Sequence, residues 1–519
     1  MKTRRRNGVT QRVRPAYGPP RKAGKRVPAP SRTGHVQKQR GNGTQGEPMN
    51  TVLVRGGHVV TMDPERGDLP DTDILVRDGR IADIGTRLPA RGADVVEAGG
   101  RIVVPGFVDT HQHVWQGFLH GLAADWSFAR YMREVRGGYG GCFGPEEAYL
   151  GSLLGGLESI SAGVTTVVDH AHLQTTAETG DALLRGLWDS GIGGYFAYAL
   201  QNAPDWLGDA PTGPEALNDL LTRTPDAHHD DRFRAARTTL AGLDDTGTHR
   251  LRLGVALPET AAYLPLDAAR TLLERVRALG AEFITAHWNA AVHGGRYVST
   301  LAALVDEGFF SGPTVLSHCN QFNDDDLDVL ARAHIGLATT PGTEGGMALG
   351  PFLARRLAER GGAAGIGIDT SCYTRCDLLA EARALLLAER RAADSLAKEP
   401  LPARAALELL TSTGARAVGL HDETGTLTPG KRANITVVAP DPIRGRALGD
   451  PAVTLLFHTS PSDIETVLVD GVPRKRAGEL VGHTPATLAP RTEQARHTIR
   501  TRYVTLPQEV IAGAWQGMF

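Results

Sequence analysis

Residues 104–113 read Val-Pro-Gly-Phe-Val-Asp-Thr-His-Gln-His, an apolar run that ends in ionisable side chains. Such a short run predicts a buried strand, and on an extended backbone the side chains of residues i and i+2 point to the same side. His111 and His113 can therefore hold one ion between them. With 18 histidines in the chain, a His-x-His pair also arises by chance, so the rest of the sequence must decide its meaning.

Apolar β-rich runs alternate with helical patterns through the middle of the chain, residues 106–430. Eight runs predict strands, at residues 103–108, 165–169, 193–199, 251–257, 283–287, 314–318, 335–339 and 365–369. Strands that alternate with helices imply a parallel sheet, and eight such units predict an α/β fold of the (β/α)8 TIM barrel type. A doubly wound sheet is the alternative, although no Gly-rich phosphate loop follows the first strand.

Both ends of the chain carry shorter β-rich runs separated by turns that contain Gly and Asp. Residues 49–105 and 431–475 predict one small β-sandwich built from both chain ends. Residues 476–519 predict a C-terminal arm with a helix near residues 508–515, suited to an oligomer contact.

Two further stretches predict irregular structure. Residues 1–48 hold 13 of the 56 Lys and Arg residues and only one of the 58 acids, and they lack apolar periodicity. They predict a disordered basic tail, or a mis-start upstream of Met49. Residues 201–250 predict an extended loop that exposes His228 and His229.

Composition limits the class of protein. Four cysteines in 519 residues exclude a disulfide scaffold and suit the reducing cytoplasm. Cys142, Cys319, Cys372 and Cys376 are therefore expected to be small core or pocket residues. No apolar run approaches the roughly 18 residues that a membrane span needs. Beyond residue 48 acids outnumber bases, which argues against a nucleic-acid binder.

Four more predicted strands end in ionisable residues, and these are Asp169, His170, His287, His318 and Asp369. In a TIM barrel the catalytic groups lie at the carboxyl ends of the strands. With the two histidines of the first strand, His287 and Asp369 would complete a site of three imidazoles and one carboxylate, leaving one position for water. These ligands suit one Zn²⁺ or Fe²⁺ ion. His170 and His172 have no supporting spacing and are expected to be packed, hydrogen-bonded residues.

Residues 104–113 resemble the first-strand signature of the amidohydrolase superfamily, and so do residues 425–434, which read Gly-Thr-Leu-Thr-Pro-Gly-Lys-Arg-Ala-Asn. Residues 117–122 and 163–169 resemble the branch that contains cytosine deaminase, S-adenosylhomocysteine deaminase and the atrazine and triazine chlorohydrolases. The resemblance covers about residues 50–475. It implies a metal-dependent hydrolase that attacks a C–N or C–Cl bond of a nitrogen heterocycle or cyclic amide, and a homo-oligomer of two or more subunits.

The resemblance also assigns roles. The family's metal ligands fall on His111, His113, His287 and Asp369. Since Asp369 would also lie beside the attacking water, our hypothesis is that it takes the proton of that water. The family's sixth-strand histidine, which contacts that water or the substrate, falls on His318. Members with two metals usually bridge them with a carboxylated lysine, and no lysine lies in any of the eight predicted strands, so the resemblance implies a single metal.

One departure from the branch concerns proton transfer. The branch usually reads His-x-x-Glu after the fifth strand, whereas here the fourth position is Ala290, which cannot transfer a proton. Glu344, Asp169 and Glu259 are the candidate replacement acids from other loops. Alternatively, the leaving group needs little protonation, as chloride does, or the reaction is not a hydrolytic deamination.

Polar and aromatic residues near the predicted strand ends are candidate pocket walls, with ordinary packing as the alternative. These substrate-binding candidates are Trp115, Gln116, His120, Trp126, Trp288, Asn289 and Glu344. Two other functions compete with the hydrolase: a metal-dependent non-hydrolytic or ring-opening enzyme of secondary metabolism, and a catalytically dead binding protein. The intact set of four ligands argues against the latter.

Overall fold

Eight parallel strands form the central sheet of the computed structural model, which describes residues 51–289, 291–293, 296–392, 400–441, 443 and 449–516. In chain order the strands are β6 (Phe107–Gln112), β7 (Val164–Ala171), β8 (Gly193–Ala199), β9 (Leu251–Ala256), β10 (Ile284–Trp288), β13 (Thr314–His318), β14 (Gly336–Thr339) and β15 (Ala364–Ile366). The chain after β15 closes the ring against β6, because the Asp369 amide donates to the His111 carbonyl at 2.9 Å and the His113 amide donates to the Asp369 carbonyl at 2.7 Å. The predicted (β/α)8 TIM barrel is confirmed.

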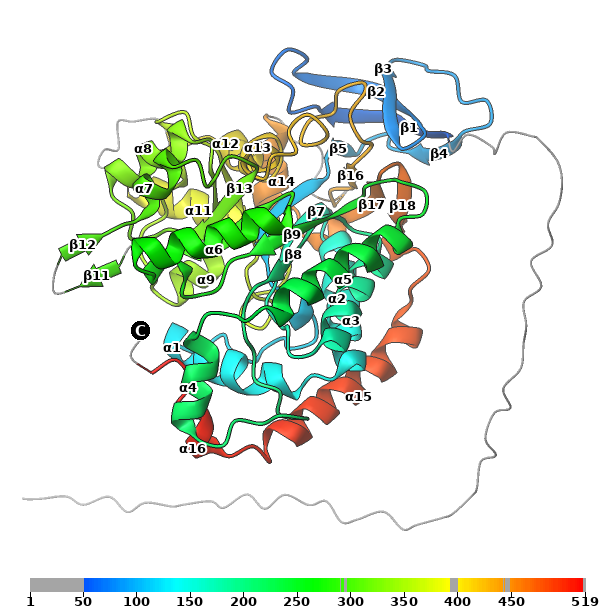
Figure 1. The fold of residues 1–519 in the computed structure, drawn as a ribbon. Helices are drawn as coiled ribbons and strands as arrows, with labels where there is room; N and C mark the ends of the chain where they lie inside the picture. Colours follow the sequence, from blue (N-terminus) through cyan, green and yellow to red (C-terminus); the bar gives the residue numbers. More distant parts are fainter. Residues whose placement is uncertain are drawn as a thin grey trace, which may run out of the picture. The chain divides into compact units, whose positions relative to one another are not determined.

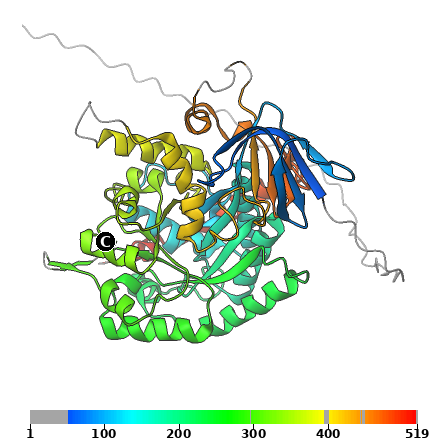
Figure 2. The ribbon, with the colours of Figure 1, turned by 90° about the horizontal axis from the view of Figure 1, so that it is seen from above.

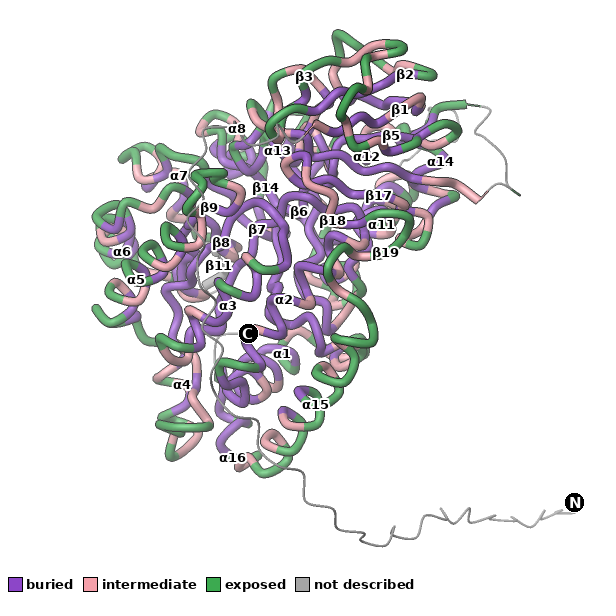
Figure 3. The backbone as a smooth tube through the Cα atoms, turned by 90° about the vertical axis from the view of Figure 1, so that its right-hand side faces the viewer, coloured by how far each residue is buried: buried purple, intermediate pink, exposed green. Residues whose placement is uncertain are grey.

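Helices cover the outer face of this barrel, and Figure 1 shows several of them alongside β7, β8 and β9. The longer ones are α2 (Pro145–Ser161), α3 (Ala177–Ser190), α5 (His228–Leu243), α6 (Leu266–Leu279), α8 (Asp324–Arg332) and α11 (Leu378–Arg391). In α6 the buried Leu272, Leu273, Val276 and Leu279 follow the helical spacing of three and four. Strands β6, β7 and β8 are buried along their whole length, as Figure 3 shows in purple, because helices lie outside them and side chains fill the interior.

The described chain also contains shorter helices. They include α1 (Phe128–Tyr131), a π-helical segment (Met132–Tyr139), α4 (Pro214–Thr222), α7 (Leu301–Asp306), α9 (Pro341–Gly346), α10 (Ala354–Ala358), α12 (Ala403–Leu409), α13 (Ser412–Ala417) and α14 (Pro451–His458). The hairpin β11 (Ala291–His293) and β12 (Arg296–Val298) follows β10. No helix in the described stretches is both long and apolar enough to cross a membrane.

A second sheet joins the two chain ends. It contains β1 (Thr51–Val60), β2 (Asp68–Arg77), β3 (Arg80–Gly85), β4 (Asp94–Glu97), β5 (Ile102–Pro105), β16 (Ile435–Val438), β17 (Ile464–Val469), β18 (Val472–Arg476) and β19 (Glu479–Leu480). Strand β16 runs antiparallel to β5, with Val437 opposite Val103, and Figure 2 shows the blue and orange strands side by side. The second sheet from both chain ends is therefore as expected.

The first predicted strand proves to be two. The expected strand 103–108 splits at Gly106 into the end of β5, which belongs to the second sheet, and the start of β6, which belongs to the barrel. A Cβ at Gly106 would lie 2.2 Å from Thr165 Cγ2, so only glycine fits at this crossing. Apolar patterning could not show the break, because both strands are buried and β-rich.

The expected extended loop at residues 201–250 is wrong, because this stretch contains α4 and α5. Helix α5 buries a narrow stripe of Phe233, Ala236 and Leu240, which its many charged neighbours obscure in the sequence. His229 is buried rather than exposed, and its Nε2 lies 3.1 Å from Asn202 Oδ1.

At the carboxyl terminus, α16 (Gln508–Ile511) matches the start of the expected helix near residues 508–515. The longer α15 (Pro485–Tyr503) was not anticipated, since its apolar residues are sparse and only Ala495 and Ile499 are buried. The expected basic tail at residues 1–48 and the substituted position Ala290 lie outside the described residues.

Candidate metal centre

Four predicted ligands converge at the carboxyl end of the barrel. His111 and His113 come from the end of β6, and Asp369 follows β15 where the barrel closes. The Nε2 atoms of His111 and His113 lie 3.4 and 3.3 Å from Asp369 Oδ1. His287, near the end of β10, places its Nε2 3.1 Å from His111 Nε2. His111 therefore belongs to two groups of close ligand atoms, one with His113 and Asp369 and one with His287 and His318.

The hydrogen bonds made by the Nδ1 atoms of His113 and His287 determine which ring nitrogen is available to bind a metal ion. His113 Nδ1 donates to the His170 carbonyl at 2.9 Å, and His287 Nδ1 donates to Glu259 Oε2 at 2.6 Å. In a neutral imidazole the other nitrogen, Nε2, then carries only a lone pair. His113 Nε2 consequently faces Asp369 Oδ1 as one acceptor facing another, an arrangement that a cation would stabilise. The donor set thus fits a divalent metal with nitrogen and oxygen ligands.

The charge states of the ligands suit the same conclusion. Burial lowers the pKa of His111 well below its ordinary value and also lowers the pKa of His287. Burial alone would raise the pKa of Asp369, but the adjacent imidazoles of His111 and His113 outweigh that effect and hold it well below the usual range. Neutral imidazoles and an ionised carboxylate are the forms that bind a metal ion.

His318 stands beside this group at the end of β13. One of its ring nitrogens lies within 4.8 Å of a ring nitrogen of His111 and one of His287. Its backbone φ of +71° and that of Asp369 of +63° are in the left-handed region, which non-glycine residues rarely adopt and which is found at functional sites. Burial lowers the pKa of His318, but its hydrogen bond with Glu344 and the charge of Asp369 more than compensate, so the pKa is raised.

Glu344 holds His318 in place from the first turn of α9. Its side chain is fully buried, and its Oε1 accepts from His318 Nδ1 at 3.2 Å and from the Thr340 amide at 2.9 Å. Its Oε2 accepts from Thr339 Oγ1 at 2.7 Å and from Asn320 Nδ2 at 3.2 Å. Because both of its oxygens accept hydrogen bonds, the Glu344 carboxylate holds the His318 ring in place. The other ring nitrogen of His318 faces the candidate metal centre.

The other two candidate acids have different surroundings. Glu259 binds His287 through one oxygen and Arg136 through the other, and although burial would raise its pKa, these two partners outweigh burial and lower it. Asp169 is buried in β7, where its Oδ1 accepts from the Val114 amide at 3.1 Å. Burial raises the pKa of Asp169 to about 7.

The sequence model of the amidohydrolase family matches residues 102–474. The chain belongs to the amidohydrolase family. Among curated relatives, the 5'-deoxyadenosine deaminase of Methanosarcina acetivorans is 27% identical, with the alignment covering 82% of this chain and 92% of that protein. The 5-methylthioadenosine/S-adenosylhomocysteine deaminase of Desulforamulus reducens is 25% identical over 82% of this chain and 93% of its own.

Solved structures share the fold of this amidohydrolase. An adenosine deaminase from Xanthomonas campestris superimposes with a TM-score of 0.71 at 21% identity, covering 88% of this chain and 99% of that one. An atrazine chlorohydrolase from Arthrobacter aurescens gives 0.69 at 21% identity, covering 86% and 99%. The resemblance read from the sequence is thus confirmed, and the enzyme is a metal-dependent amidohydrolase that acts on C–N bonds other than peptide bonds.

Two of the candidate pocket walls are buried beside the candidate metal centre of this amidohydrolase. Trp115 Nε1 donates to His172 Nδ1 at 3.0 Å. Gln116 Oε1 accepts from the hydroxyl of Thr370, the residue that follows Asp369 in the chain. Both side chains therefore contact neighbours of the ligands.

The other candidates have partners of their own. The His120 ring lies 2.8 Å from Glu158 on α2, and the guanidinium of Arg130 lies 4.4 Å above the ring of Trp126. These two candidates are paired with side chains outside the ligand group.

The residues after His287 differ in burial. Trp288 is only 2% exposed and packs edge-on against Phe310 in the core. Asn289 is partly exposed, and its Oδ1 accepts from the Gln321 amide at 3.5 Å.

Two histidines that the sequence left as packed residues lie against the ligands. The His170 ring stacks on His287 with centroids 4.2 Å apart, and the His172 ring stacks on His113 at 3.9 Å. They are packed as expected, but against the metal centre. The sequence could have predicted this position, because His170 and His172 are spaced i, i+2 at the carboxyl end of a strand, as His111 and His113 are.

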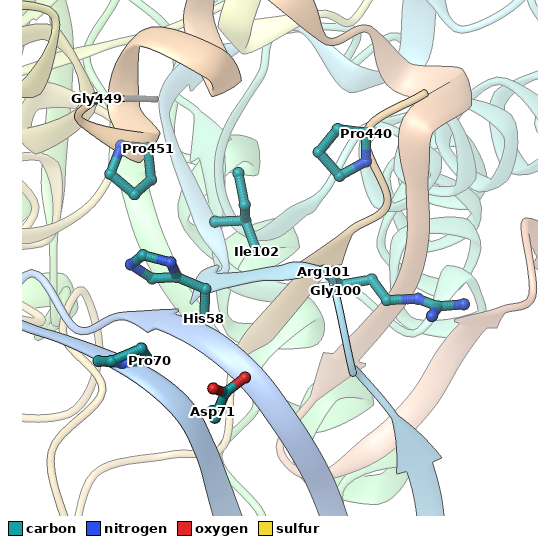
Figure 4. A pocket seen from close by; sticks show the side chains of 9 residues that line it. All are labelled: His58, Pro70, Asp71, Gly100, Arg101, Ile102, Pro440, Gly449 and Pro451. Atoms are coloured by element: carbon teal, nitrogen blue, oxygen red, sulfur yellow. The ribbon is translucent and has the colours of Figure 1, made fainter. Parts of the chain in front are cut away.

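A separate hollow of about 140 Å³ lies at the second sheet, between β1, β2 and the start of α14. Figure 4 shows the His58 ring near Pro451, with the Arg101 side chain extending away from that ring. The Arg101 guanidinium is paired with Glu465 at 3.1 Å. The hollow shares no residue with the metal centre.

Proposed function

We propose that the enzyme binds one divalent metal ion, zinc or alternatively iron, and hydrolyses a C–N bond of a nitrogen heterocycle or cyclic amide. The observation that carries this proposal is the arrangement of His111, His113, His287 and Asp369 beside His318. The Nε2 atoms of His111 and His113 lie 3.4 and 3.3 Å from Asp369 Oδ1, and His287 Nε2 lies 3.1 Å from His111 Nε2. Relatives named as deaminases of adenine nucleosides support an exocyclic amino group as the leaving group.

The metal, when bound, would supply a water molecule that ionises near neutral pH. Asp369 takes a proton at a carboxylate oxygen. Glu344 holds the Nδ1 proton of His318, which leaves Nε2 to hold or move a second proton. Glu259 and Glu344 are each bound to a histidine, Asp169 accepts from the Val114 amide, and Ala290 offers no carboxylate. We therefore assign proton delivery to the leaving group to His318.

A small-molecule substrate and a homo-oligomeric state complete the proposal, supported by the resemblance to the branch. The four described cysteines are all free and buried, which supports a reducing, cytoplasmic setting.

A second candidate reaction is hydrolysis of a C–Cl bond. It is favoured by the alanine at position 290, because chloride leaves without protonation. The product of water attack would have the same new C–O bond, and only the leaving group would differ.

The test is a substrate panel with ammonia and chloride both measured, in ¹⁸O-labelled water. Adenosine, 5'-deoxyadenosine, 5'-methylthioadenosine, S-adenosylhomocysteine, cytosine and a chlorotriazine form the panel. We expect ammonia release with one ¹⁸O in the product, and its loss in Asp369→Asn but not in the exposed control His249→Asn, whose side chain is 75% exposed. Chloride release alone would favour the second reaction, and a product without ¹⁸O would refute hydrolysis.

A further inference from the structure

A buried chain of three side chains connects separate loops of the barrel behind one metal ligand. Arg136 lies in the π-helical segment after β6, Glu259 lies in the loop after β9, and His287 lies near the end of β10. His287 Nδ1 is 2.6 Å from Glu259 Oε2, and Arg136 Nη1 bonds to Glu259 Oε1. The carboxylate thus joins a cation on one side to a metal ligand on the other.

Glu259 is held by its backbone as well as its side chain. Its amide donates to Gln201 Oε1 at 2.8 Å, which fixes the loop after β9 beside the end of β8. The Arg136 and Glu259 side chains are only 4% and 8% exposed. Taking the charge of Glu259 away would leave the Arg136 guanidinium buried without its carboxylate partner, which is costly in a protein interior.

The three histidine ligands differ in how their far nitrogens are held. His113 Nδ1 donates to a backbone carbonyl, that of His170. His111 Nδ1 is buried and has no hydrogen-bond partner among the described residues. Of these three ligands, therefore, it is His287 whose orientation and tautomer depend on a side-chain carboxylate.

We infer that Glu259 is a positioning residue for the metal ligand His287 and that Arg136 holds Glu259 in that role. The fixed Nδ1 proton keeps the lone pair of His287 on Nε2, directed at the metal position. The inference rests on the proposed metal centre and adds what sets the geometry of its third imidazole. It also gives Glu259 a role other than that of the missing acid.

The experiment compares zinc affinity, measured by chelator competition, in the wild type, Glu259→Gln and a control. The control is Glu423→Gln, because Glu423 is also an arginine-paired carboxylate, bound to Arg252 at the amino end of β9, and contacts none of the ligands. We expect Glu259→Gln to bind zinc about 10- to 100-fold more weakly, and Glu423→Gln to match the wild type. Wild-type affinity in Glu259→Gln would overturn the inference.

A spectroscopic readout separates positioning from a general loss of structure. The visible absorption of Co²⁺-loaded protein reports ligand geometry, and we expect it to change in Glu259→Gln but not in Glu423→Gln. If Glu259→Gln does not fold, Arg136→Lys decides, since it keeps the charge but loses the planar fork. Weaker zinc binding in Arg136→Lys would support the inference, and unchanged binding would overturn it. A wild type that binds no zinc would refute the metal centre itself.

Discussion

The two ends of strand β9 carry the same kind of ion pair in different settings. Near the amino end, Arg252 pairs with Glu423, and the two side chains are 24% and 28% exposed. Beyond the carboxyl end, Glu259 pairs with Arg136, and the two are 8% and 4% exposed. The third partner also differs, because Glu423 binds a second arginine, Arg432, whereas Glu259 binds His287.

The difference shows that the role of an arginine–glutamate ion pair depends on its burial and on the third side chain that the glutamate contacts. Arg432 also pairs with Asp470 in the turn between β17 and β18, so the amino-end network ties the barrel to the second sheet. The carboxyl-end network ends on His287, a proposed metal ligand. In TIM-barrel enzymes, residues at the amino end of the barrel contribute to stability and residues at the carboxyl end carry the chemistry. Here one ion pair lies at each of these two ends of strand β9.

The largest effect should come from removing two ligands at the carboxyl end. In the double variant His111→Ala/His113→Ala, bound metal should fall from about one ion per chain to near zero, because two of the four donors are lost. Elemental analysis measures this directly, with His249→Asn as the control for a substituted histidine. Equal metal content in both variants would contradict the proposed centre.

A smaller effect at the same end should follow Glu344→Gln. An amide NH₂ would replace one acceptor oxygen among the donors His318, Asn320, Thr339 and Thr340, which should cost about 2–3 kcal/mol of unfolding free energy. Urea unfolding measures that loss. Because the His318 ring would lose its fixed partner, kcat should also fall about 10- to 100-fold at unchanged metal content. An unaltered kcat would show that Glu344 has no role in the chemical step.

The smallest effect should come from the amino end. Glu423→Gln weakens partly exposed pairs with Arg252 and Arg432, so the unfolding free energy should fall by about 1 kcal/mol or less. Turnover and zinc affinity should equal those of the wild type. A loss of zinc affinity in this variant would show that the ion pair at the amino end of β9 also affects the metal site, which would contradict the proposed difference between the two ends of the strand.

Much of this site could be predicted from the sequence because the rules involved are local. Apolar runs ending in His111, His287, His318 and Asp369 predict strand ends, and parallel strands bring their carboxyl ends to one edge. The spacing of His111 and His113 predicts a shared direction. These rules need no knowledge of which loop touches which.

Other features depend on contacts that the sequence does not encode locally. Arg136 and Glu259 lie 123 residues apart and meet only because the loops after β6 and β9 fold over the same barrel end. Helix α5 was missed because its buried face is narrow, and charged residues surround it.

The sequence by itself therefore determined the barrel, the second sheet from both chain ends and the four residues that converge as candidate ligands. Periodicity and strand polarity are properties of neighbouring residues, and they suffice for those conclusions. Only the tertiary structure decided which group binds the Nδ1 atom of each of three histidines: a backbone carbonyl for His113, a carboxylate for His287 and a carboxylate for His318. Hydrogen bonds between distant loops depend on how the loops pack, which no local pattern specifies.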